Sequence, residues 1–145
     1  MDIPVSSHGR REPAHPSITA EQISELVEQF YGRVQGNERL GPIFAARVKG
    51  DWAPHLAKMK GFWRSVLLKT GEYKGRPVPV HVQIDGIGDE DYRVWLGLFR
   101  ETVAEVFEAE ARPVVIEAAE RIASSLWLAT SGKLLERPPT WSRVD

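Results

Sequence analysis

Apolar residues recur at three- and four-residue spacing along four long segments of the chain, a pattern typical of amphipathic helices. The first predicted helix runs from about residue 20 to residue 36, and its apolar face holds Ile23, Leu26, Val27, Phe30, Tyr31 and Val34. Thr19 followed by Gln22 has the form of a capping box, which predicts the start of this helix. Gly36 and Asn37 are expected to end it, since Gly and Asn favour helix C-termini.

The other three long helices follow the same periodicity. The second is predicted at about 52–69, stopping at Thr70 and Gly71, with an apolar face made by Trp52, His55, Leu56, Met59, Phe62, Trp63, Val66 and Leu67. The third is predicted at about 89–110, and the fourth begins at Pro113 and ends near Gly132. Between the first and second long helices, Gly41 and Pro42 mark a new start of helical structure, and Ile43 and Phe44 are expected to form a short apolar turn.

The segment 72–88 is rich in glycine and proline and interrupts this periodicity. A loop of that length in a compact domain is usually functional or carries a short helix. No strand pattern and no internal repeat is found, so the fold class is predicted to be all-α. We expect a flexible N-terminal tail at 1–16, one domain at 17–132 and a C-terminal tail at 133–145.

Composition and charge exclude several classes of function. A chain of 145 residues is one domain, and its net charge of −1 gives no basic surface for nucleic acid. The sequence contains no cysteine, which excludes disulfides, zinc–thiolate sites and thiol nucleophiles. No signal peptide, membrane-spanning run or phosphate-binding glycine motif is found, and we expect a cytoplasmic monomer that contacts no membrane.

Two histidines in different settings are the main candidates for ligands or polar neighbours of a cofactor. His55 lies on the apolar face of the second long helix, whereas His81 follows a segment restricted by Pro77 and Pro79. A flat iron cofactor needs an imidazole on each side, or one ligating imidazole opposite a polar pocket. The residues alone leave simpler alternatives open: a surface-loop His81, a core or rim His55 and a rim Tyr31.

An ordered series of short motifs resembles the group III truncated haemoglobins of bacteria. The resemblance covers about residues 18–130 and is specific because of the order and spacing of its members. These are Phe30-Tyr31, Leu40-Gly41-Pro42-Ile43-Phe44, His55 with Phe62-Trp63, Leu67-Leu68-Lys69-Thr70-Gly71-Glu72-Tyr73-Lys74-Gly75, Pro79-Val80-His81 and Trp95-Leu96-Gly97-Leu98-Phe99.

This resemblance implies a truncated globin, in which two pairs of helices form a two-over-two sandwich around haem b. It implies His81 as the iron ligand, and Tyr31, His55 and Trp95 as the polar groups on the opposite, distal side. The other haem-contacting residues that it implies are Phe44, Met59, Phe62 and Trp63. Lys58, Arg64, Tyr73, Lys74 and Arg76 are candidates to face the haem propionates.

The implied function is binding of oxygen and other diatomic ligands, such as nitric oxide or carbon monoxide, at a five-coordinate iron. Because Tyr31 and Trp95 are hydrogen-bond donors, a high oxygen affinity is expected. The alternative is a haem redox enzyme that performs nitric-oxide dioxygenation or peroxidase-like chemistry on peroxide with an external reductase. A further alternative is a helical interaction module without cofactor, in which Tyr31, His55, Trp95 and His81 are unrelated in space.

Overall fold

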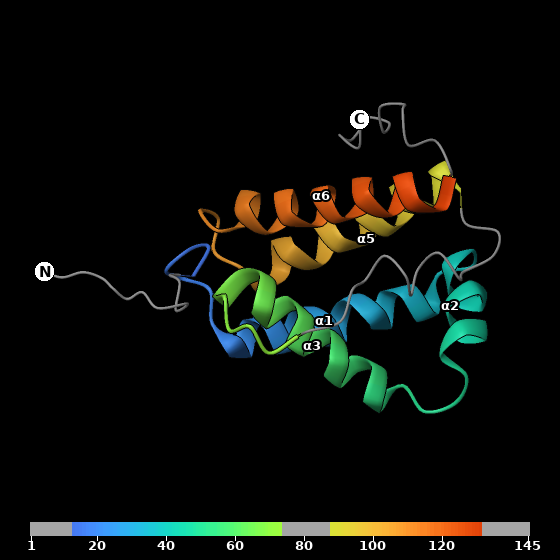
Figure 1. Ribbon diagram of the computed structural model, residues 1–145, viewed down its shortest axis with the longest axis horizontal. Coiled ribbons are helices and arrows are strands. Elements are labelled where there is room, and N and C mark those ends of the chain that lie inside the picture. Colours follow the sequence, from blue (N-terminus) through green and yellow to red (C-terminus); the bar gives the residue numbers. More distant parts are fainter. Residues whose placement is uncertain (1–12, 74–87, 132–145) are drawn as a thin grey trace, which may run out of the picture.

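The computed structural model describes residues 13–73 and 88–131, with side chains as far as residue 128. The described elements are all helical: α1 (Ala20–Gly36), α2 (Leu40–Val48), α3 (Ala53–Leu68), α5 (Asp89–Val106) and α6 (Arg112–Ser131). Helices α1 and α3 form one contacting pair and α5 and α6 form another, while contacts between α1 and α5 join the pairs (Figure 1). The described part of the chain is therefore all-α, as the sequence predicts.

Helix α1 is the centre of the core. Its predicted capping box is present, because Thr19 Oγ1 accepts the N–H of Gln22 at 3.1 Å and Gln22 Oε1 accepts the N–H of Thr19 at 3.0 Å. All six residues of the predicted apolar face are buried. On its other side Arg33 ties α1 to α5, donating to Thr102 Oγ1 at 2.6 Å and to Glu105 Oε2 at 2.7 Å.

The start of α5 is bound to two other helices by carboxylates of its first turn. Asp91 accepts two hydrogen bonds from Arg39, the residue that precedes α2. Asp89 Oδ1 accepts the indole N–H of Trp127 in α6 at 2.6 Å. These contacts place the beginning of α5 against both neighbours, so the face of α5 that carries Trp95 has a fixed direction.

Two elements differ from the sequence prediction. Residues 40–48 form a complete helix, α2, where only a short apolar turn was expected. Helix α5 ends at Val106 rather than near residue 110, because Phe107 is extended, with φ −109° and ψ 154°. The early end buries Phe107 and Ala111 in the core, and Phe107 accepts a hydrogen bond from Arg112 Nε at 2.9 Å.

The second long helix matches its prediction in extent but not in burial. Its second half is buried through Phe62, Trp63 and Leu67. The apolar residues of its first half, Trp52, Leu56 and Met59, are only half-buried. Within residues 13–73 and 88–131, no helix combines the length and the apolar character that a membrane crossing requires.

Candidate functional site

Tyr31 lies on the inner face of α1 and is 2% exposed. Its ring contacts Phe30, Phe44, Trp52 and His55. Burial raises the pKa of the Tyr31 phenol above its usual value, so the hydroxyl keeps its proton at neutral pH. Tyr31 is therefore a protonated phenol on the inner face of α1, a group that can donate a hydrogen bond.

His55 lies beside Tyr31, on the first half of α3. The two ring centroids are 5.3 Å apart with an interplanar angle of 88°. The Nε2 atom of His55 is itself buried, although the residue as a whole is half-buried. The structure thus brings together two of the three polar residues that the resemblance implies for the distal side.

Trp95 reaches the same region from α5. Its ring meets Phe30 edge-on at 5.4 Å, and Phe30 meets Tyr31 edge-on at 4.9 Å, so Tyr31 and Trp95 lie against one shared ring. The described residues offer the indole N–H of Trp95 no hydrogen-bond acceptor. Tyr31, His55 and Trp95 therefore belong to one connected aromatic cluster.

The aromatic residues expected to contact haem extend this cluster. Phe44 of α2 is buried, with its ring 6.4 Å from that of Tyr31. Trp63 stacks on Phe99 at 5.1 Å, and Phe99 stacks on Trp95 at 5.9 Å. Phe62 packs edge-on against Trp63 at 5.4 Å, while Met59 is half-buried against the core.

His81, the expected iron ligand, lies outside the described residues, as do Lys74 and Arg76. Among the other residues expected to face the haem propionates, Arg64 is paired with a carboxylate of this chain. Its Nε and Nη2 each donate to Glu72 at 2.8 Å, and these bonds lower the pKa of Glu72 to about 2. Arg64 is therefore already neutralised by Glu72. Lys58 is exposed on α3 and Tyr73 is half-buried.

The sequence placed Trp52 only on the apolar face of the second long helix, whereas the structure places its ring against Tyr31 and His55. Its ring contacts both Tyr31, at 6.2 Å, and His55, at 5.6 Å. The signal was present in the spacing, since Trp52 precedes His55 by three residues and shares its helical face. Phe30 and Phe99 were also missed as members of the cluster; their three- and four-residue spacing identified only a core.

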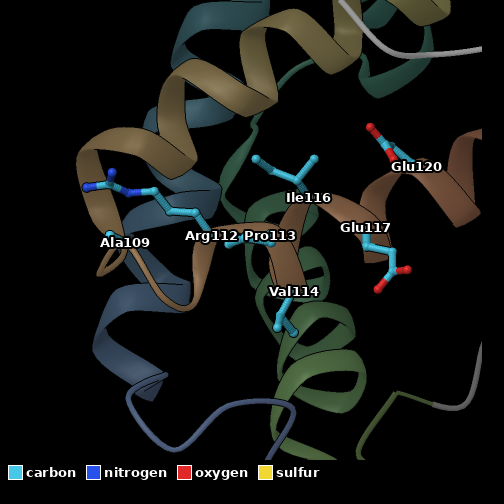
Figure 2. A pocket seen from close by; sticks show the side chains of 7 residues that line it. All are labelled: Ala109, Arg112, Pro113, Val114, Ile116, Glu117 and Glu120. Carbon is cyan, nitrogen blue, oxygen red and sulfur yellow. The ribbon is translucent and has the colours of Figure 1, made fainter.

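An open hollow elsewhere on the molecule contains none of these residues. It lies at the beginning of α6, and its lining includes Pro113, Val114, Ile116 and Glu117 (Figure 2). Arg112, which also borders it, is engaged with the carbonyl of Phe107. The polar residues expected to bind a ligand are gathered at the aromatic cluster instead.

Comparison with known proteins identifies the family of the chain. No protein-family model matches it. It is 35% identical over 111 residues to the group 3 truncated haemoglobin Ctb of Campylobacter jejuni, and the match covers 74% of this chain and 87% of that protein. The crystal structure of a group III truncated haemoglobin from Campylobacter jejuni superposes with a TM-score of 0.72 at 35% identity, covering 78% of this chain and 91% of that one. The chain belongs to the group III truncated haemoglobins.

Proposed function

We propose that this globin binds haem b through His81 and takes a diatomic ligand on the side lined by Tyr31, His55 and Trp95. The observation that carries the proposal is the meeting of Tyr31 with His55 directly, and with Trp95 through the Phe30 ring, in one aromatic cluster. A diatomic ligand that gains negative charge on binding is stabilised by donors gathered on one side, so the distal assignment accounts for this arrangement.

The residues around Tyr31 fit a flat apolar cofactor. The first half of α3 leaves Trp52, Leu56 and Met59 half-buried, although their apolar face points in the same direction as the buried second half. Phe44, Phe62 and Trp63 add aromatic surface from α2 and α3. Binding sites for small molecules combine such apolar lining with a few polar groups that fix orientation.

Haem bound at this site would supply an iron able to take up a diatomic gas or peroxide. Tyr31 and Trp95 act as donors to the ligand, because a phenol that keeps its proton and an indole N–H both donate. Both side chains are held by the Phe30 ring, so they are oriented before the ligand arrives. Preorganised donors stabilise developing negative charge, and this favours a high oxygen affinity with slow release.

A redox enzyme is the second candidate. Two donors held against one ring can polarise an O–O bond, which favours peroxidase-like chemistry or nitric-oxide dioxygenation with an external reductase. A stopped-flow comparison of oxygen release with nitric-oxide consumption on the reduced protein separates this candidate from simple ligand binding. We expect a cytoplasmic monomer in either case.

The decisive experiment is expression with haem supplied, followed by absorbance spectroscopy of the purified protein and of His81→Ala. The natural chain should show a strong haem band, and His81→Ala should lose most of its haem because the iron ligand is gone. A colourless natural protein would refute haem binding. Full haem content in the variant would refute His81 as the ligand and leave the family assignment intact.

A further inference from the structure

We propose that Trp52 is a positioning residue that holds the His55 ring beside Tyr31, and that it thereby sets how fast a diatomic ligand enters and leaves. This inference rests on the proposed function, because it concerns the same distal site. Sequence resemblance assigns the distal side to Tyr31, His55 and Trp95. The role of Trp52 follows from contacts in the structure alone.

Trp52, His55 and Tyr31 form a closed triangle of ring contacts. The centroid distances are 5.3 Å between Tyr31 and His55, 5.6 Å between His55 and Trp52, and 6.2 Å between Tyr31 and Trp52. Both contacts of His55 are edge-on, with interplanar angles of 88° and 87°. The imidazole is therefore packed against two larger rings, and rotating it away from Tyr31 breaks its contact with at least one of them.

The three members differ in exposure. Tyr31 is buried, while His55 and Trp52 are half-buried at the beginning of α3. An outward movement of the imidazole would begin from this half-buried position, whereas Tyr31 is enclosed by α1, α2 and α3. The indole of Trp52 restricts that movement because it packs against His55 at 5.6 Å.

The backbone before Trp52 is constrained to place this indole. Lys49 and Gly50 both have positive φ, 55° and 96°, which reverses the chain between α2 and α3. A lysine in this conformation is uncommon and costs free energy that the surrounding structure must offset. Asp51 Oδ1 then accepts the N–H of Ala53 at 3.1 Å, and the carbonyl of Trp52 accepts the N–H of Leu56 at 2.8 Å. The hydrogen bond made by Asp51, before Trp52, and the one accepted by the Trp52 carbonyl from Leu56 together fix the backbone at Trp52.

The test is flash photolysis of the carbon monoxide complex of the haem-loaded protein. Trp52→Leu should raise the association rate constant and the escaping fraction roughly two- to tenfold, as expected from losing one aromatic contact. Trp52→Phe retains a ring and should give a smaller change. Ile116→Ala, an apolar substitution at a half-buried residue of α6 outside the triangle, is the control and should leave both quantities unchanged.

A double-mutant cycle separates positioning from simple shielding. In a His55→Ala background, Trp52→Leu should have little further effect, because no imidazole remains to be held. The infrared C–O stretching band reports the polar surroundings of the bound gas independently of rate, and Trp52→Leu should broaden or split it as His55 occupies more positions.

The outcomes distinguish this inference from the function on which it rests. An unchanged rate in Trp52→Leu, or an equal factor with and without His55, would overturn the positioning role. If those results accompany a normal haem band and an effect of His55→Ala, the proposed function stands. A protein that retains no haem would refute the proposed function first.

Discussion

Asp91 accepts two nearly parallel hydrogen bonds from Arg39, Nε to Oδ1 at 2.7 Å and Nη2 to Oδ2 at 2.9 Å. Its Oδ2 also accepts the N–H of Gly88 at 2.8 Å, so one buried carboxylate joins the beginning of α2 to the first turn of α5. Helix α2 carries Phe44 and α5 carries Trp95. The Arg39–Asp91 pair therefore fixes the two helices that contribute Phe44 and Trp95 to the aromatic cluster relative to each other.

Asp91→Asn should lower the melting temperature at neutral pH by roughly 3–6 °C, because bidentate hydrogen bonds to a charged carboxylate are stronger than those to an amide. Arg39 lowers the pKa of Asp91 below its usual value of 3.8. A lowered pKa contributes stability above the unfolded value and loses it as pH falls below about 4, so the variant and natural curves should converge there.

The control is Glu117→Gln, which removes an exposed Glu117–Arg121 pair in α6 and should leave the melting temperature nearly unchanged. A gap between Asp91→Asn and the natural chain that stays constant from neutral to acidic pH would contradict this account of Asp91.

Tyr31→Phe should accelerate oxygen dissociation about fivefold or more, because one hydrogen bond in a dry pocket is worth about 1 kcal/mol. The measurement is stopped-flow displacement of oxygen from the reduced protein. Tyr92→Phe, which also deletes a buried phenol hydroxyl but on α5 outside the cluster, should leave the rate close to that of the natural chain. Equal rates in Tyr31→Phe and the natural chain would remove Tyr31 from the distal role.

Trp95→Phe tests the second donor. Phenylalanine can keep the contacts with Phe30 and Phe99 but has no N–H, so stability should change little while oxygen dissociation accelerates. Combined with Tyr31→Phe, the effect should differ from the product of the single effects, since both donors serve one ligand. Strictly multiplicative rates would indicate that the two side chains act on the ligand independently.

Gly41→Ala should destabilise the fold by roughly 1–3 kcal/mol, the usual cost of overpacking. A Cβ at Gly41 would lie 2.6 Å from the carbonyl oxygen of Gln35, so α2 must move away from the end of α1. Gly32→Ala is the matched control: nothing lies within 4 Å of a Cβ there, and alanine inside a helix should stabilise by about 0.5–1 kcal/mol. Denaturant unfolding measures both, and a neutral Gly41→Ala would contradict the close approach.

The long helices could be predicted well from the sequence, because each has its own apolar periodicity and its own residues that favour a helix start or end. The capping box at Thr19 and the glycine at Gly36 define α1 locally, and both are found in the structure. The end of α5 at Val106 could not be predicted in this way. It is set by the burial of Phe107 and Ala111 against the core, a tertiary effect that overrides local helical preference.

The site was predicted through resemblance more than through pattern. Periodicity placed Tyr31, His55 and Trp95 on inward faces, but faces of different helices meet only in the folded chain. Spacing placed Trp52 on the same helical face as His55, but its contact with Tyr31 depends on the reversal at Lys49 and Gly50, whose backbone conformation no hydrophobic pattern indicates. The pairing of Arg64 with Glu72 likewise joins the end of one element to the chain beyond it.

Burial is uneven between the α1–α5 interface and the first half of α3, and we expect this difference to set the order in which the parts of the protein become ordered. The faces of α1 and α5 that meet at Phe30 and Phe99 are closed by protein alone, with both rings 1% exposed or less. The first half of α3 is closed much less completely. We expect the cofactor-free chain to form a protected nucleus while the beginning of α3 exchanges its amide hydrogens readily. Insertion of the prosthetic group would then be a late step, because the group would enter a protein in which α1 and α5 are already packed together.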